Sequence, residues 1–231
     1  MTRVDHLSFE RLDVDGALAE SAERAWGMSR GTFLAAAAGG SAAVIGLTAR
    51  DAAAQGGKLG ARDVAILNYA LVLEYLQSSF YTEAERLKAL RGDAAEAARV
   101  VGSVERAHVK AFRDVLGSKA TKRPSFDFQG TTEGQEPFLK TAVAFEDLAV
   151  AAYKGQATRL KAQSALTAAV SIHSVEARHA AWMRYLVGAN PARTAFDQPK
   201  SKSEINRIVR STNFITSRAS TQRKKAPRFT G

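Results

Sequence analysis

Apolar side chains recur every three or four residues along almost the whole chain after residue 60. This spacing is typical of helices that bury one face, and it predicts four helices, at about residues 61–90, 94–117, 135–160 and 165–187. A proline occurs in the first turn of the third helix, where its missing amide hydrogen breaks no intrahelical bond. No segment has the alternating pattern of a β-strand, so every element predicted from the sequence is a helix.

The connections between these helices are short, long and short. Residues 92–93 and 161–164 are brief joins, which make antiparallel hairpins. Residues 118–134 form a long loop that carries the chain back along the bundle, with Phe126 and Phe128 as its expected anchors. The predicted fold class is therefore all-α: a ferritin-like antiparallel four-helix bundle with a long crossover between helices 2 and 3, preceded by an export-signal segment.

The first 54 residues differ from the rest and have the pattern of an export signal. Mixed charges precede an uncharged stretch of small and apolar residues at 33–47. As a helix this stretch would span about 22 Å, too little for a hydrocarbon layer of about 30 Å. The small residues Ala52 and Ala54 suit cleavage after Ala54. We therefore expect export to the periplasm or cell envelope.

The export route and the start of the chain stay open at this level. The run Ser29-Arg30-Gly31-Thr32-Phe33-Leu34 resembles a twin-arginine signal, but Gly31 stands where the second arginine belongs. A Tat-like and a Sec route are both compatible with it, and translation could begin at Met1 or at Met28. The alternative is a buried Ala/Gly-rich helix of the mature fold, in which case the protein would be cytoplasmic.

Composition and charge narrow the classes of function. The chain has 231 residues and no cysteine, which excludes disulfides, thiolate catalysis and cysteine-based metal clusters. The net charge of +10 is concentrated at the end, because only Glu204 is acidic among many basic residues from Lys200 on. We expect a flexible basic tail there, without a fifth amphipathic helix, and hence no storage cage. The expected domains are 1–54 (signal region), 58–199 (bundle) and 200–231 (tail).

Each predicted helix carries ionisable residues within its apolar stripe. The first and third helices have one glutamate each, while the second and fourth have a Glu-x-x-His pair whose members share one helix face. Buried carboxylates without partners cost several kcal/mol each, so positive charge must lie among them, and two divalent cations would balance four carboxylates. The predicted metal ligands are Glu74, Glu105, His108, Glu146, Glu176 and His179.

This pattern repeats with nearly the same spacing in the two predicted hairpins. Each hairpin contributes one glutamate and one Glu-x-x-His pair, which predicts a site with approximate twofold symmetry. Tyr81 and Tyr153 each follow the first glutamate of their hairpin by two helical turns, on the same face. They are candidates for a role beside the ligands, and the alternative is that they are ordinary core tyrosines with satisfied hydroxyl groups.

The alternative to a metal site is a set of buried Glu–His and Glu–Arg pairs, with Arg106 and Arg178 as partners. Their spacing from the nearest glutamates turns both arginines away from the carboxylate face, which favours metal. Hard oxygen ligands with two imidazoles and no sulfur suit iron or manganese, with zinc as a substitute. His6 and His173 lie outside the pattern and receive no role.

The six predicted ligands resemble the di-metal carboxylate site of the ferritin-like superfamily. The stretches 126–128, 142–153 and 174–181 are similar to exported bacterial ferritin-like domain proteins, a group that includes desiccation-associated members. The resemblance covers about residues 58–199. It implies a centre of two iron or manganese ions that reacts with O₂ or peroxide.

The predicted function is oxidation of Fe(II), or consumption of O₂ or peroxide, in stress protection outside the cytoplasm, which would make the protein an oxidoreductase. One alternative is a non-catalytic stress or desiccation protectant whose metals only brace the bundle. Another is a polyanion-binding protein whose basic tail contacts an anionic polymer or lipid surface. DNA is an expected partner only if the chain is not exported. The metal, the reductant and a homo-oligomeric state stay open.

Overall fold

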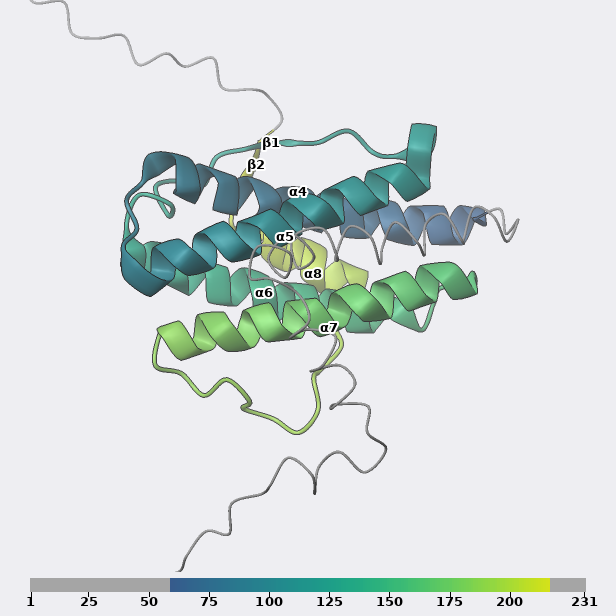
Figure 1. The fold of residues 1–231 in the computed structure, drawn as a ribbon. Coiled ribbons are helices and arrows are strands. Elements are labelled where there is room, and N and C mark those ends of the chain that lie inside the picture. The colour runs from purple at the N-terminus through teal and green to yellow at the C-terminus, as the bar shows by residue number, and fades with distance from the viewer. Residues whose placement is uncertain (1–58, 217–231) are drawn as a thin grey trace, which may run out of the picture. The chain divides into compact units, whose positions relative to one another are not determined.

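The computed structural model describes residues 59–216, which form an all-α bundle (Figure 1). Four long helices carry the fold, and a shorter helix and two very short strands complete it. In chain order the elements are α4 (Ala61–Leu87), α5 (Gly92–Leu116), the 3₁₀ turn η1 (Gly117–Lys119), β1 (Ser125–Phe126), α6 (Gln135–Ala157), α7 (Gln163–Leu186), α8 (Lys202–Ser211) and β2 (Ile215–Thr216).

The long helices pair as two hairpins, as predicted. α4 packs against α5 and α6 packs against α7, while the segment between α5 and α6 runs back along the bundle (Figure 1). The predicted fold class, an antiparallel ferritin-like bundle with a long crossover, is confirmed. The helix bounds also agree with the prediction to within a few residues.

A buried carboxylate of the first hairpin accepts hydrogen bonds from the loop that connects α6 and α7 in the second hairpin. Asp63, in the first turn of α4, is only 2% exposed. Its two oxygens accept hydrogen bonds from the backbone amides of Lys161 and Ala162, each at 2.9 Å. These amides precede α7 and have no intrahelical partner, so Asp63 satisfies the start of a helix that is distant in sequence.

An aromatic cluster fills the core between α4, α6 and the crossover. Phe80 of α4 is fully buried, and its ring centre lies between 5.0 and 5.4 Å from those of Phe128, Phe138 and Phe145. Phe128 is 2% exposed and stacks on Phe126, which is half-buried. The two phenylalanines therefore anchor the crossover as the sequence predicted.

The prediction that residues from Lys200 on form a flexible tail without a fifth helix is wrong for residues 200–216. Ile205 and Val209 of α8 are buried against the bundle, where α8 packs on α6. A capping box begins α8: the Ser201 hydroxyl accepts from the Glu204 amide, and the Glu204 carboxylate accepts from the Ser201 amide at 2.8 Å. Most residues of this segment are charged or polar, so the narrow apolar stripe that forms the buried face of α8 is a weak signal in the sequence.

The prediction that the chain has no strand is also wrong. β1 and β2 pair antiparallel, with Ser125 opposite Thr216 and Phe126 opposite Ile215. Two residues are too few to show an alternating pattern, so this pairing has no sequence signal.

The predicted signal region, residues 1–54, and the end of the basic tail, residues 217–231, lie outside the described residues. Between residues 59 and 216, the structure has no helix that is long and apolar enough to cross a membrane. The expected domain boundaries at 54 and 58 therefore stay predictions.

Candidate metal centre

The structure brings all six predicted ligands together in the middle of the bundle. Glu74 extends from α4, Glu146 from α6, and the two Glu-x-x-His pairs from α5 and α7. All four glutamates are 0% exposed, and the two histidines are 1% (His108) and 6% (His179) exposed. The helical repeat explains this convergence, because each of these residues lies on the stripe that its helix buries.

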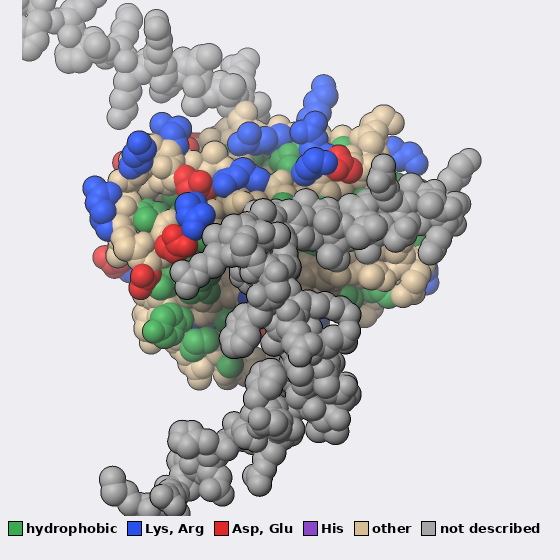
Figure 2. Space-filling view, viewed as in Figure 1, with side chains coloured by type: hydrophobic (Ala, Val, Ile, Leu, Met, Phe, Trp, Pro, Cys, Tyr) green, Lys and Arg blue, Asp and Glu red, His purple; other side chains and the backbone are tan. Residues whose placement is uncertain are grey.

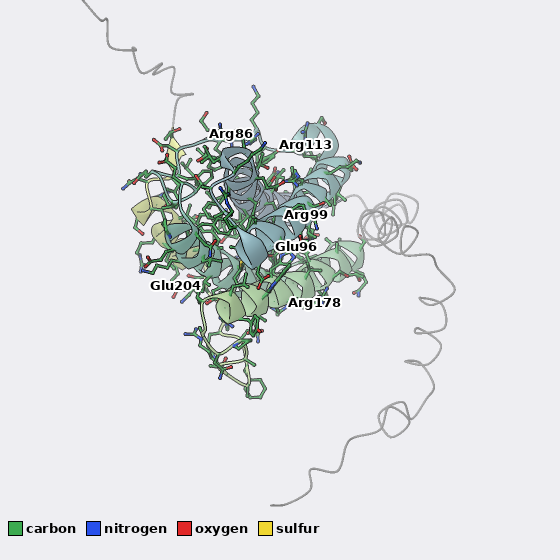
Figure 3. All side chains as sticks on the ribbon, turned by 60° about the vertical axis from the view of Figure 1, so that its left-hand side comes forward. Arg86, Glu96, Arg99, Arg113, Arg178 and Glu204 are labelled. Atoms are coloured by element: carbon green, nitrogen blue, oxygen red, sulfur yellow. The ribbon has the colours of Figure 1, made fainter. Side chains whose placement is uncertain are left out.

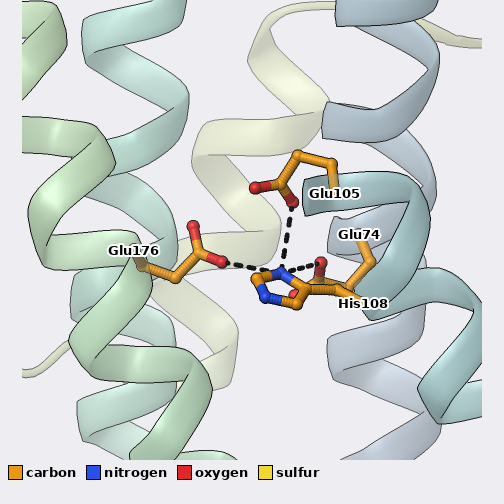
Figure 4. Close-up of side chains that lie close together, drawn as sticks. All are labelled: Glu74, Glu105, His108 and Glu176. Carbon is orange, nitrogen blue, oxygen red and sulfur yellow. Dashed lines mark ion pairs between the residues drawn. The ribbon is translucent and has the colours of Figure 1, made fainter. Parts of the chain in front are cut away.

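The first group of potential ligands surrounds His108 (Figure 4). The Nδ1 atom of His108 lies 3.2 Å from Glu74 Oε2, 3.2 Å from Glu176 Oε1 and 3.7 Å from Glu105 Oε2. The four residues come from three helices, α4, α5 and α7. Their donor atoms all lie within 4.8 Å of one another, which is compatible with binding to one ion.

The second group surrounds His179 and repeats this arrangement. The Nδ1 atom of His179 lies 3.1 Å from Glu105 Oε1, 3.5 Å from Glu146 Oε2 and 4.0 Å from Glu176 Oε2. The centres of the two imidazole rings are 6.5 Å apart. The site thus consists of two adjacent groups, one at each histidine.

Glu105 and Glu176 belong to both groups. In each of these carboxylates one oxygen faces His108 and the other faces His179. Glu74 and Glu146 each belong to one group only. If two cations bind here, Glu105 and Glu176 would be able to contribute to both, and Glu74 and Glu146 to one each. The sequence predicted the six residues but not this division, since helical spacing does not tell which carboxylate lies between two sites.

Within residues 59–216, eight potential ligand atoms at the centre have no hydrogen-bond partner. They are one oxygen each of Glu74 and Glu146, both oxygens of Glu105 and Glu176, and the Nδ1 atoms of both histidines. An unsatisfied buried polar atom is costly, and eight together are exceptional in a folded protein. Metal–ligand bonds of about 2.1 Å place neighbouring ligands about 3 Å apart, near the separations observed here. The residues fit bound cations.

Two tyrosines donate hydrogen bonds to the other oxygens of Glu74 and Glu146, the glutamates that belong to one group only. Each tyrosine lies on the opposite hairpin from the glutamate that it contacts. The Tyr81 hydroxyl of α4 donates to Glu146 Oε1 of α6 at 2.5 Å. The Tyr153 hydroxyl of α6 donates to Glu74 Oε1 of α4. The pKa of both phenols is raised well above its usual value, mainly by burial and also by the facing carboxylate. Both tyrosines therefore stay protonated and can donate a hydrogen bond.

Without a cation, the centre has strongly shifted acid–base equilibria. Burial raises the pKa of Glu74 to about 7, and burial together with Glu105 raises that of Glu176 well above its usual range. Burial lowers the pKa of His179, but Glu105 and Glu146 outweigh this and raise it to about 10. Because metal ligands must be deprotonated, cations bound here would displace protons.

At His108 and at Glu105, burial and the neighbouring charged groups shift the pKa in opposite directions. Burial lowers the pKa of His108, but Glu74 and the other carboxylates raise it well above its usual value. Burial raises the pKa of Glu105, whereas its two histidine neighbours together lower it below its usual value. Glu105, which faces both rings, is therefore more readily ionised than Glu74 and Glu176.

The arginines offered as alternative partners do not reach the centre. Arg106 is exposed and pairs with Glu85 at 2.7 Å on the outside of the first hairpin. Arg178 is exposed on the outer side of α7 (Figure 3). His173, which received no role, is half-buried on α7 and belongs to neither group. Among the described residues, no arginine therefore pairs with the four buried carboxylates.

A four-helix bundle in which facing helices hold two adjacent carboxylate–histidine groups has the architecture of the di-metal carboxylate proteins. The comparison with protein families agrees with this class: the family model described as a ferritin-like domain matches residues 62–189. This is more than half of the chain, and the protein belongs to the ferritin-like domain family. A search of curated proteins finds no match.

Proposed function

We propose that this protein is a di-metal carboxylate oxidoreductase that oxidises Fe(II) or consumes O₂ or peroxide in stress protection outside the cytoplasm. It would belong with the exported, desiccation-associated members of its family. The six predicted ligands, Glu74, Glu105, His108, Glu146, Glu176 and His179, would hold two iron or manganese ions. Hard oxygen donors, two imidazoles and the absence of sulfur support these metals.

The observation that carries this proposal is the set of eight donor atoms that lack hydrogen-bond partners and divide between two adjacent groups. A single structural cation would need one group only. Two groups that share Glu105 and Glu176 fit a pair of ions that can act together on one small molecule.

The chain contributes position and protection from water. Iron bound here would supply the electrons that O₂ or peroxide takes up. Glu105 and Glu176, with one oxygen toward each histidine, would keep the two ions adjacent. Tyr81 and Tyr153 hold the outer oxygens of Glu146 and Glu74, so that each of these carboxylates directs its other oxygen inward. The surrounding apolar core excludes bulk water from the reaction.

The expected location and partners support a protective role. The signal pattern at 1–54 favours the periplasm or cell envelope, where O₂ or peroxide would be the substrate. The basic residues toward the end of the chain would favour an anionic polymer or lipid surface as a partner.

Anaerobic titration of the metal-free protein with Fe(II), followed by admission of O₂, tests the proposal. We expect about two Fe(II) per chain to bind and both to be oxidised, because there are two ligand groups. The isosteric variant Glu176→Gln should bind much less iron, whereas Glu136→Gln, an exposed α6 residue, should bind as the parent does. Binding that raises the melting temperature without any oxidation would instead favour the protectant function.

A further inference from the structure

A cleft open to solvent lies on the outer side of the first hairpin. Its floor contains Tyr75 of α4 and Val109 of α5. Its walls are the last three turns of α5 and residues 117–123 of the crossover, and its volume is about 750 Å³. This is within the size range of small-molecule sites. None of the six predicted metal ligands lines the cleft.

The cleft is strongly basic. Figure 2 shows Lys and Arg side chains along the upper face of the bundle, with Asp and Glu side chains interspersed among them. Of the described residues that line it, Asp114 alone is acidic, whereas five are basic: Arg106, Lys110, Arg113, Lys122 and Arg123.

Two of these five charges are neutralised within the hairpin and three are not. Arg106 pairs with Glu85, and Lys110 pairs with Asp114. Within residues 59–216, the structure gives no carboxylate partner to the other three cations, Arg113, Lys122 and Arg123. They line one cleft from two segments of the chain, and an anion bound there would offset their mutual repulsion.

The crossover wall of the cleft is held in place by uncharged groups. The Arg123 guanidinium donates to the Ser79 hydroxyl from Nε at 3.2 Å and from a terminal nitrogen at 2.8 Å. The Thr121 amide donates to Asn68 Oδ1 at 2.6 Å. The bond to Ser79 therefore orients the Arg123 guanidinium without neutralising its charge.

Basic residues also favour the negative end of a helix, but that effect does not account for this cluster. It applies to Arg113, which lies in the last turn of α5. Lys122 and Arg123 come from the crossover, after the helix has ended at Leu116. The helix end therefore does not explain why they line the same cleft as Arg113.

We propose that Arg113, Lys122 and Arg123 form a binding site for anions that carry phosphoryl groups. A guanidinium matches two phosphoryl oxygens with its planar fork, and a lysine adds a compact charge beside it. The volume accommodates more than one phosphoryl group, so a compact oligophosphate fits better than a single phosphate. The shared chemistry would also suit the headgroups of anionic phospholipids at a membrane surface.

Calorimetric titration of the full-length, metal-loaded protein with tripolyphosphate tests this site. The test variant is Arg113→Gln/Lys122→Gln, and the matched control is Arg159→Gln/Arg178→Gln, which removes the same charge from exposed positions on the second hairpin. We expect roughly tenfold or greater weakening in the test variant and less than about twofold in the control. Equal weakening in both variants would overturn the proposal, since it would mean that only net charge matters.

Two further arms identify the source of the phosphoryl group. Sedimentation with phosphatidylglycerol vesicles is measured for the parent protein and for the same test and control variants. It shows whether lipid headgroups bind in this cleft. Loss of vesicle binding in the test variant alone assigns the site to lipid, and loss of tripolyphosphate binding alone assigns it to a free oligophosphate. Binding of neither probe, or equal affinity for citrate, would contradict the proposal. Bound metal per chain should stay unchanged in both variants, which separates this test from that of the metal centre.

Discussion

The two hairpins of the bundle are alike inside and different outside. Inside, each contributes one glutamate, one Glu-x-x-His pair and one tyrosine, and each tyrosine reaches the glutamate of the other hairpin. Outside, α4 and α5 border a basic cleft, whereas α6 of the second hairpin is covered by α8.

The difference follows from what each surface must satisfy. Four buried carboxylates and two imidazoles tolerate few arrangements, because each atom needs a partner in a region without water. Outer surfaces are solvated, so their residues can diverge and take separate roles. Experiments that treat the two halves in parallel are therefore the most direct way to test the symmetry of the interior and the asymmetry of the exterior.

The largest effect is expected from removing a shared ligand. Glu105 lies in both groups and Glu74 in one. Glu105→Gln should therefore lower bound metal from about two ions per chain to well below one, whereas Glu74→Gln should remove about one. Metal analysis after gel filtration measures both. Loss of both ions from Glu74→Gln would contradict the division into shared and single ligands.

The next largest effect is expected on the packing of α8 against α6 of the second hairpin. A Cβ at Gly155 of α6 would lie 2.0 Å from the carbonyl oxygen of Lys200, which precedes α8. Gly155→Ala should force this backbone away and lower the free energy of unfolding by about 1–3 kcal/mol. Urea unfolding measures the loss, and limited trypsin digestion should cleave α8 sooner. Gly60→Ala, with open space around it, should leave both measurements unchanged.

The pH dependence of metal stabilisation sharpens the comparison between the metal-free and metal-bound interior. The raised pKa of Glu74, about 7, means that its protonated form stabilises the metal-free fold at low pH. This contribution is lost as the pH rises from about 4.5 through 7. Metal binding needs the ionised form, so the rise in melting temperature caused by metal should grow between pH 5 and pH 8. A rise that shrinks over this interval would contradict the assignment of Glu74 as a ligand.

The smallest effect is expected from the two phenols. Tyr81→Phe and Tyr153→Phe each remove one hydrogen bond to a single-group glutamate and keep the packing. Each substitution should weaken metal affinity by roughly tenfold. The two effects should be similar, because the two tyrosines occupy equivalent positions in the approximately twofold-symmetric site. Competition with a chelator measures the affinity. Tyr185→Phe, at an exposed position, is the control, and an equal loss there would mean that the phenols serve only folding.

Helical periodicity and connection length were sufficient to predict the bundle, because each long helix must bury a continuous stripe. The same periodicity placed six ionisable residues on those stripes. It missed α8, although Ser201 and Glu204 are a recognisable capping box and Ile205 and Val209 are one turn apart. The basic charge of this segment favours a flexible tail, but its capping box and apolar spacing are typical of the helix that forms.

The sequence by itself determined the fold class and the residues that point into the bundle, since both depend on local spacing along a helix. Only the tertiary structure decided which glutamates lie between the two histidines, which tyrosine meets which carboxylate, and where the last basic segment packs. These relations join residues far apart in the chain, and they depend on how helices are offset against one another. The spacing along any single helix carries no information about that offset.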